Sequence, residues 1–190
     1  MSKAFETKIY VFDTSVLQDE SLFKKFYRTV PSFRQKKVDF YKDYKDKCLS
    51  LGVGLVLIKA LKSAGYDIKN LEWAYYENGR PYFKGNEEIQ FALSHSHERA
   101  LCAISVNRIG CDVEFVTPDN ETEIEQWTKI ESYAKATDLE LAYLLSGKTA
   151  PDSKFHFKQL ELKDGYIYTV CSEEEINDNQ VQVLKIEDFD

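Results

Sequence analysis

The distribution of apolar and polar residues along the chain predicts a mixture of strands and helices. Short segments rich in β-branched and aromatic residues, several of them alternating with polar ones, are expected to be strands. These segments are 8–13, 71–76, 81–83, 91–94, 101–106, 109–116, 155–162, 166–171 and 181–186. Segments with apolar residues at helical spacing predict helices, and these are 19–30, 34–64, 121–136 and 139–145.

The order of these elements predicts an α+β fold. The strands cluster, and the helices are inserted between them in blocks, unlike the regular alternation of a doubly wound parallel sheet. The longest helix is apolar nearly all round from Leu49 to Ile58, so we expect it in the core. A change from one half of the fold to the other is expected near Asn107-Arg108, without a flexible linker.

Composition favours a soluble, cytoplasmic protein that spans no membrane. The longest apolar run is far shorter than a membrane span requires, and residues 1–6 lack the apolar core of a secretory signal. The four cysteines form no close pair of the kind seen in zinc knuckles. We expect them to be buried free thiols in a reducing compartment, with a zinc site or a nucleophilic cysteine as the alternatives.

Charge is distributed unevenly. The net charge of −7 argues against a nucleic acid as the partner, because phosphate backbones attract basic proteins. Between Ser21 and Ser50, however, nine basic residues face only three acidic ones. Such a segment suits a phosphorylated small molecule or an acidic protein. A solvated helix face is an equally good interpretation from charge alone.

Three carboxylates are candidate metal ligands. Asp112 and Glu114 are two residues apart on one predicted strand, so their side chains lie on the same face, about 7 Å from each other. The two carboxylates repel each other unless a cation lies between them. On the following helix, Glu131 and Lys135 share a face with Trp127. If that helix packs beside the strand, Glu131 completes an all-oxygen cluster suited to Mg²⁺ and a diphosphate ester. Taken separately, these residues are also typical of an exposed strand and a surface ion pair.

Two further segments are candidate ligand-binding sites. The strand 91–97 ends in hydroxyls and imidazoles that can donate to phosphate oxygens, among them Ser94 and His95. Gly79, Arg80 and Pro81 follow Asn78 in a predicted hairpin turn, where bare backbone and a proline ring could flank a flat base. A plain turn is the simpler interpretation of that segment.

In order and spacing, these segments resemble the 4′-phosphopantetheinyl transferase superfamily, and within it the monomeric type that activates peptide and polyketide synthetases. NGRPYF at 78–83 resembles the family's G-[KR]-P segment, and FALSHS at 91–96 its strand ending in S-H-S. IGCDVE at 109–114 resembles its G-[IV]-D-[IVL]-E metal motif, and WTKIESYAKA at 127–136 its W-x-x-K-E helix. DKCLSLGVGLVL at 46–57 and the closing strands at 155–171 also match, so the resemblance spans roughly residues 31–186.

The resemblance implies a pseudo-dimer of two related α+β halves, 1–107 and 108–190, with coenzyme A bound between them. Gly79, Arg80 and Pro81 would border the adenine and its ribose. Ser94 and His95 would hold the 3′-phosphate. Further basic residues, Arg34, Lys37 and Lys47, would lie nearby.

For the chemistry, the resemblance implies that Asp112, Glu114 and Glu131 bind Mg²⁺ across the pyrophosphate, while Lys135 contacts phosphate. Glu131 or a metal-bound water would take the proton of a carrier-protein serine. Phosphopantetheine would then pass from coenzyme A to an acyl or peptidyl carrier protein, releasing 3′,5′-ADP. One chain with two halves suffices for a monomer.

The sequence departs from the family pattern at several places. Ile130 replaces the usual lysine before the glutamate, and Asp138 and Glu140 replace glycines. Only residues 115–126 connect the metal strand to the tryptophan helix, where family members have a longer insertion. These departures leave open a degenerate relative that binds coenzyme A or a carrier protein without catalysis. Another metal-dependent phosphoryl-transfer enzyme is the third interpretation.

Overall fold

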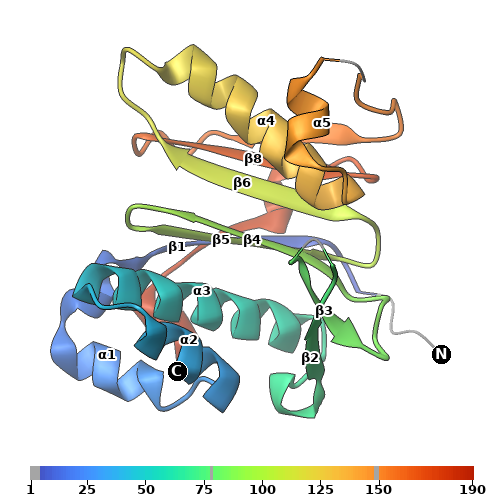
Figure 1. Cartoon of the computed structure of the whole chain (residues 1–190). Helices are drawn as coiled ribbons and strands as arrows, with labels where there is room; N and C mark the ends of the chain where they lie inside the picture. The colour runs from blue at the N-terminus through green and yellow to red at the C-terminus, as the bar shows by residue number, and fades with distance from the viewer. Residues whose placement is uncertain (1–4, 78, 148–149) are drawn as a thin grey trace.

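The computed structural model describes residues 5–77, 79–147 and 150–190, and within them the chain forms four layers. Figure 1 shows two β-sheets face to face, with helices covering the outer face of each. An apolar cluster that includes Ile9, Leu101, Cys111 and Val170 fills the space between the sheets. The α+β fold class is therefore confirmed.

The first sheet has the strand order β4-β5-β1-β9. Its strands are β4 (Gln90–Ser96), β5 (Arg99–Ser105), β1 (Lys8–Asp13) and β9 (Val181–Leu184). β1 pairs antiparallel with β5 and parallel with β9. The last strand of the chain therefore lies beside the first, and residues after 180 return to the sheet built by the N-terminal half.

Three helices cover the outer face of this sheet: α1 (Glu20–Tyr27), α2 (Ser32–Phe40) and α3 (Tyr44–Ser63). The single helix predicted over 34–64 is thus two helices. The break falls at residues 41–43, where the Asp43 carboxylate accepts hydrogen bonds from the backbone amides of Lys45 and Asp46 and caps α3. The rest of the prediction holds, because α3 is buried along most of its length and packs in the main apolar core.

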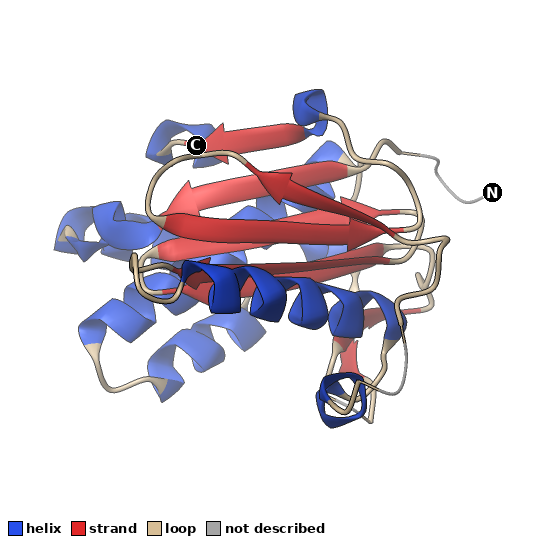
Figure 2. Ribbon diagram, turned by 90° about the horizontal axis from the view of Figure 1, so that it is seen from above, coloured by secondary structure: helices blue, strands red, loops and turns tan. Residues whose placement is uncertain are grey.

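The second sheet has the order β6-β8-β7, with the strands β6 (Ile109–Phe115), β8 (Tyr166–Ser172) and β7 (His156–Leu160). Helices α4 (Glu121–Thr137) and α5 (Leu141–Leu145) lie on its outer side, and Figure 2 shows α4 running alongside the strands. Gly110 permits this packing, because a Cβ at that position would lie 1.9 Å from the Ser132 carbonyl oxygen. The glycine thus brings α4 against the strand that carries Asp112 and Glu114.

A two-stranded hairpin, β2 (Glu72–Tyr75) and β3 (Pro81–Lys84), stands apart from both sheets at one end of the molecule. It matches the predicted hairpin, although Asn78 lies outside the described residues. The remaining elements are short 3-10 helices, η1 (Thr14–Gln18), η2 (Ile68–Asn70), η3 (Asp178–Gln180) and η4 (Ile186–Phe189).

The cysteine prediction is confirmed in its structural part, since all four thiols are free and buried. Within the described part of the chain, no helix is long and apolar enough to cross a membrane.

Candidate active site

Asp112, Lys135 and Glu131 meet where α4 packs on β6. Asp112 is only 1% exposed. Lys135 Nζ lies 2.7 Å from Asp112 Oδ1 and 3.3 Å from Glu131 Oε2, so the ammonium joins the two carboxylates. Asp112 Oδ2 is buried and has no hydrogen-bond partner among the residues that the structure describes. A buried carboxylate oxygen without a partner carries a desolvation cost that a bound cation would offset.

Glu114, the next residue on the same face of β6, is less buried and makes a different contact. Its Oε2 accepts a hydrogen bond of 2.7 Å from the Ser96 hydroxyl. In the described residues, no three His, Cys, Asp or Glu side chains are already grouped to hold a metal ion. The structure therefore brings two of the three predicted metal ligands together through Lys135 and leaves Glu114 on Ser96, so the triad stays a prediction.

The electrostatics of Asp112 and Lys135 are linked. Burial raises the pKa of Asp112 to about 6, although the Lys135 ammonium and the Ser94 hydroxyl oppose that rise. Burial alone would lower the pKa of Lys135, but the Asp112 carboxylate and its other neighbours outweigh burial and raise it. Lys135 therefore remains a cation, while Asp112 changes charge close to neutral pH.

A second group of residues forms a small basic cavity between α2, α3 and β4. Its volume is about 60 Å³, and its lining includes Arg34, Lys37 and His95, together with Asp46. Arg34 is 1% exposed and donates from Nη2 to the Ser50 carbonyl oxygen over 2.6 Å. Its Nε and the Ser50 hydroxyl are buried and, within the described part of the chain, have no hydrogen-bond partner. Unpartnered donors beside clustered cations are the features expected of an anion site.

The pKa values at this cavity are consistent with excess positive charge. Burial lowers the pKa of Arg34 to about 10. Burial and then the charge of Arg34 lower the pKa of Lys37. The side chain of His95 is exposed on one side, yet the protein packed around its ring, followed by Lys37, Lys135 and Arg34, lowers its pKa. A bound anion would relieve this repulsion.

Two predicted residues, Ser94 for the 3′-phosphate itself and Lys47 for its surroundings, are not among the residues that line the basic cavity. Ser94 faces the opposite side of β4 from His95, and its hydroxyl bonds to Asp112 Oδ1 over 2.7 Å. Lys47 lies outside the lining of the basic cavity. Sequence reasoning missed Tyr41 and Ser50, which do line it. Tyr41 belongs to none of the matched segments, and Ser50 lies within the matched segment 46–57 but was not singled out there.

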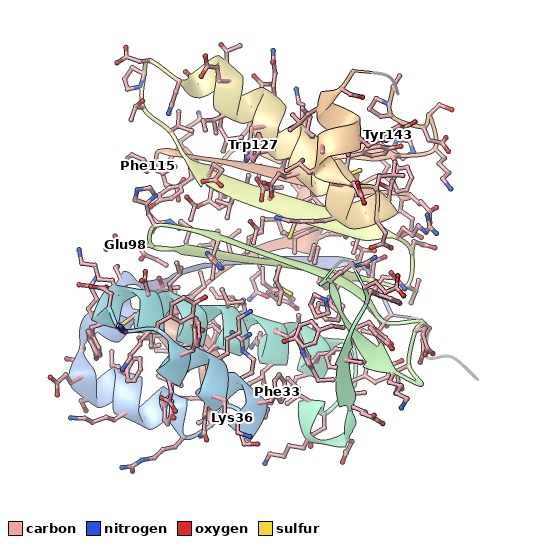
Figure 3. The ribbon with its side chains drawn as sticks, viewed as in Figure 1. Phe33, Lys36, Glu98, Phe115, Trp127 and Tyr143 are labelled. Carbon is pink, nitrogen blue, oxygen red and sulfur yellow. The ribbon has the colours of Figure 1, made fainter. Side chains whose placement is uncertain are left out.

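A larger cleft of about 560 Å³ lies between the hairpin turn and α4, and Glu131 is the one candidate metal ligand among its described lining residues. Gly79, Arg80 and Pro81 line it at one end, and Glu131 and Lys135 at the other. Its floor is largely apolar and is formed by β4 residues, Phe91, Ala92 and Leu93. Figure 3 shows the side chains around this region, with Tyr143 labelled on the neighbouring helix α5.

Arg80 and Asp138 join the two walls of the cleft. Arg80 Nη1 lies 2.9 and 2.8 Å from the two carboxylate oxygens of Asp138, and Arg80 Nη2 lies 3.0 Å from Gln90 Oε1. Asp138 sits at the C-terminal cap of α4 with a left-handed backbone, φ +60°. This position, where the family pattern has a glycine, therefore fixes the hairpin against α4.

Comparison with known proteins gives one informative similarity. The chain is 29% identical over 85 residues to a 4′-phosphopantetheinyl transferase from Bacillus subtilis. The matched segment covers 45% of this chain and 38% of the length of that relative. No family model matches the chain.

Proposed function

We propose that this protein is a 4′-phosphopantetheinyl transferase that moves phosphopantetheine from coenzyme A to a serine of an acyl or peptidyl carrier protein. The similarity to the Bacillus subtilis transferase supports the general class of reaction. The observation that carries the proposal is the cleft lined by the Gly79–Pro81 turn, Glu131 and Lys135, together with the basic cavity that reaches β4 at His95. The proposal includes the division into related halves, 1–107 and 108–190.

Coenzyme A fits this arrangement by its charges. Its adenine would lie at Gly79, Arg80 and Pro81. The basic cavity at Arg34, Lys37 and His95 supports a place for the 3′-phosphate, with Lys47 in the same part of α3. The pyrophosphate would then lie in the cleft toward Lys135, whose ammonium can contact phosphate oxygens.

Asp112, Glu114 and Glu131 are the residues that would hold Mg²⁺. Their donor atoms are all carboxylate oxygens, and the unpartnered Oδ2 of Asp112 fits a cation. When bound, the ion would neutralise charge on the pyrophosphate. Because Lys135 already joins Asp112 and Glu131, its ammonium would turn toward phosphate when the carboxylates bind metal.

In the reaction, the carrier serine oxygen attacks the β-phosphorus of coenzyme A. A new serine O–P bond forms, the bridging P–O bond breaks, and 3′,5′-ADP leaves. Glu131 would accept the serine proton, and Lys135 would stabilise negative charge on the phosphoryl oxygens.

The test is transfer to an apo carrier protein in the presence of coenzyme A and Mg²⁺, followed by mass spectrometry for the phosphopantetheine adduct. We expect Asp112→Ala and Glu131→Gln to abolish the adduct while coenzyme A binding, measured by calorimetry, largely survives. Glu125→Gln is the matched control, because Glu125 and Lys129 form the same i,i+4 pair one and a half turns earlier on α4, 2.7 Å apart. An adduct at the wild-type rate with Glu131→Gln would contradict the catalytic role.

A protein that binds coenzyme A or a carrier without turnover is the second candidate. Two observations favour it: the ammonium that lies between Asp112 and Glu131, and the apolar Ile130 in place of a cation. Binding of coenzyme A without adduct on every carrier encoded near the gene would select this candidate.

A further inference from the structure

The two sheets meet at their edges through serine side chains. β4 is the edge strand of the first sheet, and β6 is the edge strand of the second. β6 pairs with β8 along one edge, and on its other edge the amides of Val113 and Phe115 lie near β4. Val113 N–H donates to Ser94 Oγ, and Phe115 N–H donates to Ser96 Oγ, each over 3.3 Å. Hydroxyls thus take the place of carbonyl acceptors between the strands.

Each of these hydroxyls also binds a carboxylate on β6. Ser94 Oγ donates to Asp112 Oδ1, and Ser96 Oγ donates to Glu114 Oε2, both over 2.7 Å. The same pattern repeats after two residues on both strands, as the strand period requires. Both serines are 8% exposed. We call these four residues, Ser94, Ser96, Asp112 and Glu114, the serine–carboxylate ladder.

The hydrogen-bonding capacity of each serine is used by the ladder. A hydroxyl has one donor and two acceptor sites. Ser94 also lies 3.4 Å from Lys135 Nζ, and Ser96 lies 3.3 Å from the Nδ1 of His97. Because the only proton of Ser94 points to Asp112, this serine has no donor left for a phosphate on the His95 side of β4.

The ladder runs inward from one end of the molecule. Figure 3 labels Glu98, at the turn after β4, and Phe115, at the end of β6, at that same end. The His97 and Phe115 rings pack there with centroids 4.8 Å apart. Glu114 and Ser96 form the outer, partly exposed rung, and Asp112 and Ser94 form the buried rung beside Lys135.

We propose that Ser94 and Ser96 are positioning residues, which fix the carboxylates of Asp112 and Glu114 by holding β6 against β4. Ser94 and Lys135 both bind Oδ1 of Asp112, and this leaves Oδ2 as the oxygen available to a cation. The hydrogen bonding stands independently of the reaction. The consequence for divalent-ion binding rests on the proposed function.

The first test of the ladder is amide hydrogen exchange, with NMR detection, on the full chain. Ser94→Ala should lower the protection of the Val113 amide about tenfold or more, a factor that corresponds to ~1.4 kcal/mol, while the Phe115 amide changes less. Ser96→Ala should do the reverse, so each variant is the control for the other. Unchanged protection of both amides in both variants would overturn the ladder, whether or not the protein is a transferase.

The positioning role is tested by divalent-ion affinity, measured from the Mn²⁺ electron paramagnetic resonance signal without any carrier protein. We expect Ser94→Ala to weaken Mn²⁺ binding about tenfold. Without the Ser94 hydroxyl, the Asp112 carboxylate would lose its fixed orientation and would have to be reordered when the ion binds. Ser94→Thr keeps the hydroxyl and should restore most of the affinity and the protection. Loss of protection with unchanged Mn²⁺ affinity would reduce the serine to a structural role and overturn positioning.

Two further outcomes of these experiments also decide the proposal. If Ser94→Ala does not fold, Ser94→Cys provides a weak donor of similar size, and the same ordering of affinities is expected, with Cys below Thr and Ser. If wild-type protein binds no Mn²⁺, the positioning role is overturned together with the metal site, while the exchange experiment still decides the hydrogen bonds.

Discussion

At the scale of single residues, the burial of Asp112 would make metal binding at this carboxylate depend on pH. Burial raises its pKa from 3.8 to about 6, so the folded protein keeps the proton on this carboxylate through a pH range in which an exposed aspartate would lose it. The free energy of unfolding therefore falls as pH rises from 3.8 to about 6, because ionising this buried carboxylate is unfavourable. The Lys135 ammonium limits the size of this loss. A carboxylate must be ionised to bind a cation.

We therefore expect Mn²⁺ or Mg²⁺ affinity to rise as pH increases through about 6 and then to level off, because Asp112 loses its proton there. Calorimetric titration of the free protein at several pH values measures this dependence. Asp112→Asn should remove most of the affinity and the pH dependence with it. A flat profile in the wild-type protein would mean that Asp112 is not a ligand.

The basic cavity gives a second prediction at this scale. Lys37→Gln and His95→Asn should each weaken coenzyme A binding about tenfold, the size of a charge-assisted hydrogen bond, and should leave 3′-dephospho-coenzyme A nearly unaffected. The loss for Lys37→Gln should shrink at high salt. Lys36→Gln is the matched control, since this neighbouring lysine on α2 is exposed and lies outside the cavity.

Equal losses for both forms of the coenzyme would place the 3′-phosphate elsewhere. The pKa of His95 is lowered, so its charge is present only at acid pH and is lost as pH rises through that lowered value. The contribution of His95 should therefore grow as pH falls, while that of Lys37 stays constant.

At the scale of elements, the packing of α4 on β6 depends on one glycine. A Cβ at Gly110 would lie 1.9 Å from the Ser132 carbonyl oxygen and 2.6 Å from the Ala136 amide nitrogen, both backbone atoms of α4. The helix must move to accommodate a methyl group, and overpacking of this kind costs about 1–3 kcal/mol or more. Since Glu131 and Lys135 are on this helix, the shift also changes the site.

We expect Gly110→Ala to lower the free energy of unfolding by about 3 kcal/mol and to weaken divalent-ion binding. Urea denaturation measures the first effect. Gly85→Ala is the control that distinguishes a steric clash from backbone strain. Among the described residues nothing lies within 4 Å of a Cβ at this position, but its φ of +75° is unfavourable for alanine. It should cost only about 1 kcal/mol and leave ion binding unchanged. Equal stability of Gly110→Ala and the wild type would show that α4 adjusts freely.

The elements themselves were largely predictable, and the failures have definite physical causes. The apolar content of β4, β5 and β6 located these strands to within two residues, since most of their side chains are buried. The helix over 34–64 was predicted as one because apolar spacing continues through its break. Asp43 carries the missed signal, since an aspartate followed by polar residues is a good helix cap.

The candidate site was predictable as a set of residues but not as an arrangement. The family resemblance predicts one phosphate for both Ser94 and His95, whereas neighbours on a strand point to opposite faces. Ser96, two positions from Ser94, could have been found by the same rule. The contact between Lys135 and Asp112 could not, because it depends on how closely α4 approaches β6, which Gly110 determines through packing.

At the scale of the whole molecule, the division at 107/108 falls between β5 and β6, where the chain passes from one sheet to the other. The sheets do not follow this division completely. β9 belongs to the second half of the sequence and to the first sheet, and Phe189 packs against Phe12 with ring centroids 4.8 Å apart. The first sheet thus contains residues from both halves of the sequence.

This pairing has a consequence for synthesis on the ribosome. A chain that emerges from its N-terminus exposes one edge of β1 until residues 181–184 arrive to cover it. During that interval the apolar strand, with Ile9 and Val11 at its centre, is open to other chains and to molecular chaperones. Completion of the first sheet therefore waits for residues 181–184, so slowing the ribosome before they emerge would prolong the period of risk.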